Sequence, residues 1–577
     1  MATEDRLVVV TFNLTKIDRV VRWALVISAV ICATAVVIAT VKAMRGAYLP
    51  LPYWDQWGAL TTGENLEMLF HQHNEHRLIA FKLISVLDNY FASGTYKVNF
   101  SVSLLLQILH AGLLIATAYC AGLKRIYEVL WATAIAFGYL FWAGQGENLF
   151  WGFQTQFFGV YACGTLAFVA LAGLRSWIGV SAALLAAIAA VGFMSNGVLV
   201  PVLLPVLAIG LRRSWLQVGA LTLVGVAVIA CYLVGYQTPG GHGHPFRSLQ
   251  NPEQILAYML TYVGSPATVL LREAMAGKLA YPQTVAIAFG AAGLASTLCV
   301  VATLAVWRSL ATPARLVLIS VILFITATAF VTALGRVNFG LDQAMSSRYL
   351  TPALVFWVAF IFLLWSLLPS PLRLLVPVSA TVSLLLMLQA SDFVARETRA
   401  VRERRDGAAT ALLAGVRDEP EFEKVFPHPD FVAQRAEVLR KDRLAIFSLP
   451  WSDWMGKPLQ SQVHIRSGFV CIGSVDQITP ISASADGSGY RSTGWAWDIY
   501  DKAAPEWILL TDAQGLVVGY GLTDSYRPDV RVVIPAVRSN FTGWRGHLKM
   551  EHPGEVRAYA LSSDARSACL IGTKTFP

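Results

Sequence analysis

Apolar runs long enough to cross a lipid bilayer recur through the first two thirds of the chain, and they constrain its fold most. A crossing helix needs about 20 apolar residues, and it satisfies its own backbone hydrogen bonds where lipid offers no partner. We predict about eleven such helices, which together make a polytopic α-helical membrane protein. The predicted spans are 23–42, 99–122, 128–143, 157–174, 177–195, 197–211, 216–236, 284–307, 314–334, 349–368 and 371–391.

One further apolar run, 254–272, is predicted to lie at the membrane interface. Asn251 and Pro252 begin it like a helix cap, and the sequence GSP at 264–266 interrupts it.

Composition and charge agree with a membrane protein. Charged residues make up 14% of the 577 residues, whereas soluble proteins carry roughly 25%. The net charge of +9 does not indicate a nucleic-acid partner, because Lys and Arg gather in the short turns between predicted spans. These basic residues are Lys16, Arg19, Arg22, Lys124, Arg125, Arg175, Arg212, Arg213, Arg308, Arg315 and Arg373. Since such turns face the cytoplasm, we expect a cytoplasmic amino terminus and a C-terminal region on the outer side of the membrane.

The first predicted outer loop holds the densest polar cluster. Pro50 and Pro52 interrupt an extended approach to Asp55, which stands between Trp54 and Trp57. A carboxylate between indoles at a membrane surface is partly desolvated, which raises its basicity and suits a general base. The alternative is a helix cap among interfacial tryptophans, and the sequence does not separate the two.

An amphipathic interfacial helix is predicted next in this loop, because Leu66, Leu69, Phe70 and His73 follow helical spacing.

The stretch HQHNEHR (71–77) overlaps the end of that predicted helix and offers imidazoles, Glu75 and Arg77 to a phosphate or a metal. The histidine spacings fit no zinc motif, so no metal or other cofactor is assigned, and a divalent cation stays an open alternative. The plain alternative is a solvated helix end.

Two later outer segments also combine polar and aromatic groups. The stretch 144–158 places Glu147, Asn148 and Gln154 beside Trp151 and several phenylalanines, which suits the hydroxyls and C–H faces of a sugar. An ordinary aromatic belt is the alternative. The glycine-rich turn GGHGH (240–244), which ends at His244, is flexible enough to close over a ligand.

Arginines flank the loop 335–349 on the side where the positive-inside rule disfavours them. Arg336 ends one predicted span and Arg348 begins the next, followed by Tyr349. Arg suits bidentate contact with phosphate, while a snorkelling membrane anchor is the alternative.

Four short motifs together resemble the GT-C class of membrane glycosyltransferases. They are YWDQW (53–57), HNEHR (73–77), ENLFWGFQ (147–154) and SSRY (346–349). The resemblance, which covers roughly residues 20–392, implies a sugar donor carried on a polyprenyl phosphate or diphosphate. It implies an acceptor that is a cell-envelope glycan, lipid or protein.

The resemblance also implies roles for single residues. Asp55 matches the first-loop catalytic acid and would be the general base, and Arg348 matches the late arginine that grips the donor phosphate. Many members carry paired acids in this loop, whereas Gln56 follows Asp55 here, so Glu64, Glu75 or Glu147 is left to supply a second carboxylate. The remaining assignments are Arg336, Arg77, His76 and Tyr349 to the donor phosphate, and Trp54, Trp57, His73, Glu147, Asn148, Trp151, Gln154 and His244 to the sugar or acceptor.

The chain changes character after the last span. Residues 393–463 are charged and predicted helical, as a linker, and 464–577 alternate apolar and polar residues as in a β-sandwich. Within this part, DAQG (512–515) predicts a turn, and RPDVRVVIP (527–535), TGWRGHLKM (542–550) and VRAYALSS (556–563) continue the strand pattern.

Two cysteines and four tryptophans stand out in the predicted sandwich. Cys471 and Cys569 bracket it, and a disulfide between them is one outcome in an oxidising compartment. Its four tryptophans are assigned to the core in preference to a carbohydrate-binding face, and they are Trp495, Trp497, Trp507 and Trp544.

Two other functions compete with sugar transfer. A lipid-sugar flippase would place ionisable groups near the bilayer midplane, where few polar residues occur, notably Gln107 and His110. A non-catalytic assembly or sensor protein would leave the first-loop cluster without a purpose.

Overall fold

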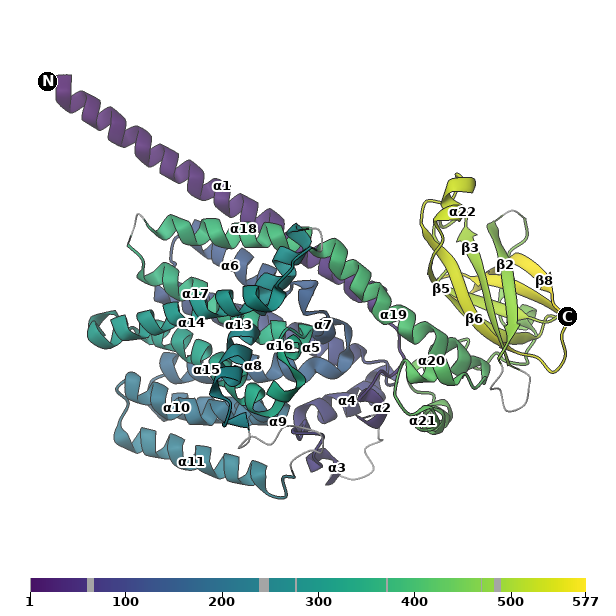
Figure 1. The fold of residues 1–577 in the computed structure, drawn as a ribbon, viewed down its shortest axis with the longest axis horizontal. Coiled ribbons are helices and arrows are strands. Elements are labelled where there is room, and N and C mark those ends of the chain that lie inside the picture. Colours follow the sequence, from purple (N-terminus) through teal and green to yellow (C-terminus); the bar gives the residue numbers. More distant parts are fainter. Residues whose placement is uncertain are drawn as a thin grey trace. The chain divides into compact units, whose positions relative to one another are not determined.

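The computed structural model describes residues 2–59, 67–237, 248–275, 278–369, 372–468, 470–481 and 489–577. The chain packs into two compact units, each formed by segments that are distant in sequence (Figure 1). The first unit contains Met1–Arg45, Gly63–Ile84 and Asn99–Ala395, and the second contains Gly46–Thr62, Ser85–Val98 and Arg396–Pro577. The first loop is therefore divided between the two units.

Eleven helices among the described residues are long and apolar enough to cross a membrane, which confirms a polytopic helical membrane protein. Of these, α8 and α17 are the most buried, with 78% of each apolar window inside the protein, so they form the centre of the bundle. The helices up to residue 389 are α1 (Ala2–Ala47), α2 (Gln56–Ala59), α3 (Glu67–Phe70), α4 (Ile79–Ala92), α5 (Lys97–Ala121), α6 (Ile126–Leu140), α7 (Gly146–Phe150), α8 (Thr155–Gly173), α9 (Ser176–Phe193), α10 (Leu199–Gly210), α11 (Trp215–Leu233), α13 (Pro252–Ala274), α14 (Pro282–Val306), α15 (Pro313–Arg336), α16 (Leu341–Ala344), α17 (Ser347–Leu367) and α18 (Leu375–Gln389).

By length and composition alone, two of the candidate spans differ from those that we predicted. Pro252–Arg272 qualifies as a span, whereas Ser195–Gly210 falls among the shorter apolar helices. The contacts at the ends of α10 show that it nevertheless runs between the two ends of the bundle. Ser195 Oγ lies 2.7 Å from His76 Nδ1 at one end, and Arg213 Nη2 donates to Leu174 O at 2.6 Å at the other.

The segment that contains α13 makes no net crossing. Arg77 Nε donates to Tyr232 O at the end of α11, and Arg336 at the end of α15 pairs with Glu75 in the same loop. Gln283 at the start of α14 donates to Asp342, six residues beyond Arg336. Because α11 ends and α14 begins at the same end of the bundle, the chain between them returns to the end that it left.

Close packing holds α13 against α14. A Cβ atom at Gly264 would lie 1.9 Å from Ala286 O, and one at Gly290 would lie 2.0 Å from Leu260 O, so only glycine fits at either position. Small residues permit this backbone approach between membrane helices. The contact fixes the depth of α13 and therefore of the tyrosines that it carries.

The amphipathic helix predicted from Leu66, Leu69, Phe70 and His73 is wrong in its extent. Leu66 lies outside the described residues, and α3 ends at Phe70. His73 and His76 instead pair through their backbones, around Asn74 with φ of +49°, a conformation that Asn tolerates. The amphipathic helix of this loop is α4, whose exposed apolar residues are Leu83, Val86, Leu87, Tyr90 and Phe91.

Arginines of α19 hold the first part of the first loop within the second unit. Arg402 Nη1 donates to Tyr48 O, and Arg405 Nη2 donates to Leu51 O, each at 3.0 Å. The helices of this part are α19 (Ser391–Ala414), α20 (Glu419–Glu423), α21 (Pro429–Lys441) and α22 (Pro528–Val533).

The C-terminal domain is an eight-stranded sheet with strand order β1-β8-β7-β4-β5-β6-β3-β2. It is antiparallel except for the pair β1 and β8. Its end strand β2 packs against β8 and β7, so the sheet curls into a sandwich-like body around one core (Figure 1). The strands are β1 (His464–Ile465), β2 (Cys471–Pro480), β3 (Gly489–Asp498), β4 (Trp507–Thr511), β5 (Val517–Tyr526), β6 (Phe541–Lys549), β7 (Glu555–Leu561) and β8 (Ser567–Thr575).

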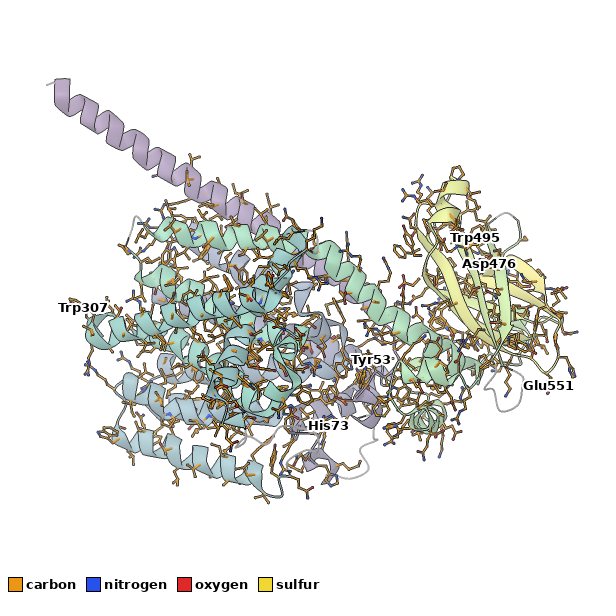
Figure 2. All side chains as sticks on the ribbon, in the orientation of Figure 1. Tyr53, His73, Trp307, Asp476, Trp495 and Glu551 are labelled. Atoms are coloured by element: carbon orange, nitrogen blue, oxygen red, sulfur yellow. A yellow bond between two sulfur atoms is a disulfide. The ribbon has the colours of Figure 1, made fainter. Side chains whose placement is uncertain are left out.

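Most local predictions for this domain hold. The turn at 512–515 joins β4 to β5, and Gly515 adopts φ of +80°, which a side chain would strain. Trp497, Trp507 and Trp544 are buried, as expected for core residues, whereas Trp495 is only half-buried (Figure 2).

The strand predicted at 527–535 is wrong. Residues Pro528–Val533 form the short helix α22, because Pro occupies a first-turn helical position and Asp529 is in the same turn.

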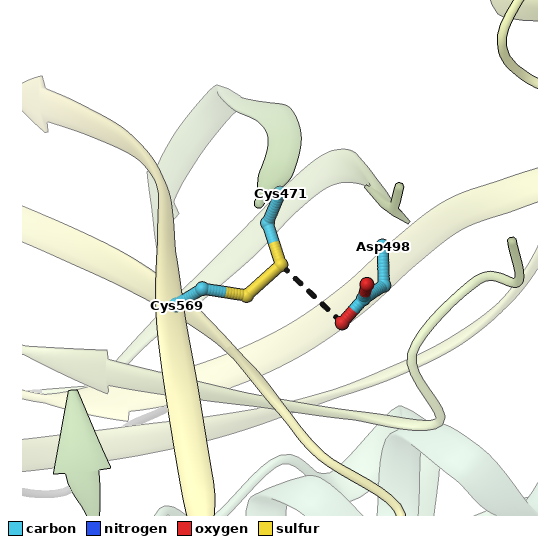
Figure 3. A group of neighbouring side chains, drawn as sticks. All are labelled: Cys471, Asp498 and Cys569. Carbon is cyan, nitrogen blue, oxygen red and sulfur yellow. Dashed lines mark hydrogen bonds between the residues drawn. A yellow bond between two sulfur atoms is a disulfide. The ribbon is translucent and has the colours of Figure 1, made fainter. Parts of the chain in front are cut away.

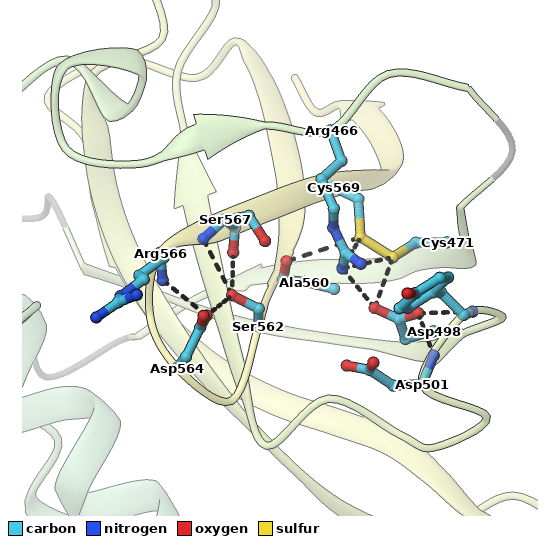
Figure 4. A network of polar contacts seen from close by, with 11 residues as sticks. Arg466, Cys471, Asp498, Asp501, Ala560, Ser562, Asp564, Arg566, Ser567 and Cys569 are labelled. Carbon is cyan, nitrogen blue, oxygen red and sulfur yellow. Dashed lines mark hydrogen bonds and ion pairs between the residues drawn. A yellow bond between two sulfur atoms is a disulfide. The ribbon is translucent and has the colours of Figure 1, made fainter.

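Cys471 on β2 and Cys569 on β8 form a disulfide, so it joins the two parts of the sheet that the curl brings together (Figure 3). Asp498 lies beside them, and Arg466 forms an ion pair with it (Figure 4). The two sulfurs are bonded to each other and Arg466 neutralises the carboxylate, so this group is not a metal site.

Replacing both cysteines by serine is expected to destabilise the sheet by about 2–4 kcal/mol, because the bond closes a long loop. Denaturant unfolding of the full chain, followed by tryptophan fluorescence under non-reducing conditions, measures the loss. Cys299→Ser, at an exposed free cysteine of the first unit, is the matched control. Equal midpoints for the double variant and the control would contradict a stabilising disulfide.

Candidate functional site

A cluster at one end of the bundle gathers Glu75, His76, Ser195 and Arg336, here called the Glu75 cluster. Arg336 Nη2 pairs with Glu75 Oε1, and His76 Nε2 lies 3.7 Å from the same oxygen. On the other side of the ring, Ser195 Oγ lies 2.7 Å from His76 Nδ1, and Ser195 N donates to the same nitrogen at 3.4 Å. The side chains of Glu75, His76 and Arg336 are 23%, 15% and 20% exposed, so a ligand can reach them.

The charge state of Glu75 follows from these neighbours. Burial alone would raise the pKa of its carboxyl group, but the charges of His76 and Arg336 and the hydrogen bond from Arg336 hold it at about 2. Glu75 is therefore an anion at neutral pH, which suits an electrostatic role better than that of a general base.

Arg77, which we predicted to bind the donor phosphate, clamps the loop to α11 instead. Its guanidinium donates to Tyr232 O at 3.0 Å, to Phe70 O at 2.7 Å, and to Val234 O. Its ring neighbour Tyr232 donates its hydroxyl to Glu75 O at 3.0 Å. Arg77 thus positions Glu75, and its donors are engaged by backbone oxygens.

A second cluster forms between the start of α7 and the start of α17, and we call it the Glu147 cluster. Arg348 Nη2 lies 2.7 Å from Glu147 Oε1, while Ser346 Oγ and Ser347 Oγ donate to Glu147 Oε2 at 3.1 and 3.4 Å. Arg348 Nε also donates to Ser346 Oγ at 3.3 Å. Arg348 is 32% exposed and Glu147 25%, so this pair too is reachable.

Asn148 fixes the backbone beneath this cluster. Its amide nitrogen donates to Arg348 O at 2.8 Å and to Thr351 Oγ1 at 2.7 Å, and Thr351 in turn donates to Gln145 at 2.5 Å. Asn148 is only 2% exposed, so it positions Arg348.

Three buried tyrosines connect the two clusters. The rings of Tyr262 and Tyr349 lie 4.9 Å apart, and the charges of Arg336 and Arg348 both act on Tyr258. The structure therefore brings together the predicted residues Glu75, His76, Arg336, Glu147, Asn148, Arg348 and Tyr349 within the first unit.

An aromatic group lies beside the Glu75 cluster. The ring of His73 (labelled in Figure 2) lies 5.4 Å from Phe153, which stacks on Trp151 at 5.1 Å. Gln154, predicted to contact a sugar, is 2% exposed and accepts a hydrogen bond from Gln156, so it belongs to the core.

Other predicted residues lie elsewhere. Asp55, Trp54 and Trp57 belong to the second unit, so their convergence with the two clusters stays a prediction. Asp55 is half-buried and directly precedes α2, the position of a helix cap, while Trp57 is fully buried and Trp54 is 43% exposed. His244 and Glu64 lie outside the described residues.

Sequence reasoning missed Ser195, Tyr258 and Tyr262 as site residues. Tyr258 and Tyr262 are four residues apart and share one face of α13. The four-residue spacing could have indicated that the two tyrosines act together. We predicted this helix to lie at the membrane interface, however, and so did not expect its tyrosines to face the arginines.

No family model, curated protein or solved structure matches this chain. The class of the protein is therefore described from its fold and its candidate site. It is a multi-pass membrane protein with a C-terminal β domain, and one end of its bundle carries two arginine–carboxylate clusters.

Arg336→Gln is expected to destabilise the first unit by about 1–3 kcal/mol, because Glu75 loses a charged partner in a half-buried site. In the unmodified protein the folded pKa of Glu75, about 2, lies below its ordinary value of 4.5. The stabilisation it provides is therefore fully present above about pH 4.5 and lost as pH falls through about 2. In the variant the folded pKa of Glu75 rises toward or above its ordinary value, so this loss at acid pH should shrink or disappear, and melting temperatures measured from pH 3 to 8 would reveal it.

The double variant Glu75→Gln/Arg336→Gln is the control. Removing both charges should restore much of the stability at neutral pH and leave no Glu75-linked change in melting temperature at acid pH. Identical pH profiles for the unmodified protein and Arg336→Gln would contradict the ion pair.

Proposed function

We propose that the protein is a membrane glycosyltransferase that takes a sugar from a polyprenyl-phosphate donor. The observation that carries this proposal is the pairing of Arg336 and Arg348 with carboxylates at a single end of a membrane bundle. A lipid-linked donor presents its phosphate at such an end while its tail lies between helices. Arg is the side chain best suited to hold that phosphate.

Arg348 has donors to spare for a ligand. A guanidinium carries five N–H groups, and the contacts described within the protein engage Nε and Nη2. Those on Nη1 are thus available for a phosphate oxygen. Glu147 and the serines hold the group in place beforehand, so little reorganisation is needed when charge develops on the leaving phosphate.

The proposed reaction is a single displacement. An acceptor hydroxyl attacks the anomeric carbon as its proton passes to Asp55, the bond from that carbon to the phosphate oxygen breaks, and the phosphate leaves with the electron pair. Inversion at the anomeric carbon follows. Arg348 stabilises the departing charge, with Arg336 and His76 beside it.

The distribution of charge supports an exoplasmic site. The end opposite the two clusters carries the basic turns, including Arg175, Arg213 and Arg373, as expected of a cytoplasmic face. We therefore place the clusters at the periplasmic face of a bacterial inner membrane, where the acceptor is a cell-envelope glycan, lipid or protein.

The polar groups within the bundle give no support to a flippase. Gln107 Nε2 donates to Leu140 O at 2.6 Å, and His110 Nε2 lies 2.9 Å from Thr165 Oγ1. Both side chains are at most 1% exposed and join neighbouring helices, which is a packing role.

Arg348→Lys is expected to lower the transfer rate about 10²–10³-fold, because a point charge replaces a planar group with several donors. The assay measures polyprenyl phosphate released from a panel of polyprenyl-phosphate hexoses and pentoses, with membranes of a deletion strain as acceptor. A fully active Arg348→Lys protein would exclude the assigned phosphate contact.

Asp55→Asn is expected to lower the same rate about 10²–10⁴-fold with folding intact, as for loss of a general base. Asp501→Asn, at an exposed carboxylate of the second unit, is the matched control and should keep full activity. Full activity in Asp55→Asn removes Asp55 as the base, and loss of folding in that variant favours the helix-cap role.

A further inference from the structure

A second charged site lies at the opposite end of the bundle. There a cavity with about 350 Å³ of empty space, including its open mouth, lies between the Arg22 region of α1, the start of α6, the last turn of α17 and the start of α18. The residues that line it are Arg22, Leu25, Val26, Tyr127, Glu128, Trp131, Trp365, Arg373, Leu374 and Pro377.

The two ends of the bundle are distinct along α17. Its first turn carries Arg348 of the Glu147 cluster, whereas Trp365 in its last turn lines this cavity. A helix of this length, 21 residues, spans about 30 Å, the thickness of the hydrocarbon core of a bilayer. The cavity therefore belongs to the other leaflet.

Guanidinium groups dominate the described charges at this end. Arg22 and Arg373 line the cavity, the charge of Arg22 acts on Arg125, and that of Arg373 acts on Arg315. The carboxylate in the lining is Glu128, which accepts a hydrogen bond from the backbone of Arg125 at 3.0 Å. Two guanidinium groups and one carboxylate in the lining leave the cavity wall with an excess of positive charge, which favours an anion there.

Aromatic rings and backbone oxygens hold these arginines in place. Arg373 stacks over Trp365 at 5.0 Å and donates to Leu368 O at 2.8 Å. Arg22 lies over the ring of Tyr127 at 5.8 Å. Fixed guanidinium groups lose little entropy when they bind an anion, and indole rings suit the interfacial region of a bilayer.

We propose that this cavity binds the phosphate of an anionic phospholipid head group from the leaflet at this end. A basic pocket between membrane helices, with aromatic walls at the interface, has the chemistry that recognises such a head group. The lipid joins α1 to α17 and α18 through Arg22 and Arg373. This site is independent of the proposed sugar transfer.

Native mass spectrometry of the full chain tests the proposal. Protein from nanodiscs of equal phosphatidylglycerol and phosphatidylcholine should retain phosphatidylglycerol preferentially. Arg22→Gln and Arg373→Gln should each lower its retention about fivefold, the effect of one interfacial arginine. Arg175→Gln removes one exposed charge at the same end but outside the cavity lining, and it should leave retention unchanged.

A second measurement does not depend on variants. The melting temperature of the unmodified protein should rise with phosphatidylglycerol and not with phosphatidylcholine. Equal retention of the two lipids, or equal retention by Arg373→Gln and Arg175→Gln, would overturn the proposal. Displacement of the lipid by millimolar sodium phosphate would show a site for soluble phosphate and would overturn the lipid assignment.

Discussion

The pairing of arginines with carboxylates at the ends of membrane helices underlies the arrangement of the first unit. A partly buried charge is costly unless it has a partner, and two half-buried arginines at one end of the bundle are both paired. Arg336 finds Glu75 in the first loop, and Arg348 finds Glu147 before α7. Each ion pair connects a late helix, α15 or α17, to a polar segment earlier in the chain. The two clusters of the candidate site form around these pairs. The tyrosines of α13 fill the space between the two pairs because glycine contacts seat that helix against α14.

In the second unit, too, a buried charge is paired with charged neighbours. Asp418 is fully buried and accepts hydrogen bonds from Arg491 at 2.6 Å and His547 at 2.9 Å. Burial alone would raise its pKa, but these hydrogen bonds and charges hold the pKa well below the ordinary value of 3.8. Asp418 therefore joins the helical stretch after the last span to β3 and β6. The stretch that we predicted as a linker packs with the sheet in one compact unit.

Much of this architecture could be predicted because it rests on local patterns. Apolar length predicted the number of spans, alternation predicted the sheet, and the bracketing cysteines offered a disulfide as one of two outcomes. The predictions that failed are those in which one local sequence pattern was overridden by another interaction. Leu69, Phe70 and His73 fit a helix, but the backbone pairing of His73 with His76 closed a turn instead. The run RPDVRVVIP alternates like a strand, yet Pro528 begins a helix there. Length and composition alone select α13 and not α10 as a span, the reverse of what we predicted, and contacts at the ends of each segment decide its path.

The sequence by itself determined the membrane class, the β domain and the residue types available for chemistry, because hydrophobic length, periodicity and charge act within a few turns of chain. Only the tertiary structure decided which charges pair. Arg77 and Arg348 look equally suited to phosphate in the sequence, yet carbonyl oxygens of α11 engage the first and a reachable carboxylate holds the second. Such pairing depends on contacts between helices that are far apart in the sequence, and a local sequence pattern does not specify those contacts.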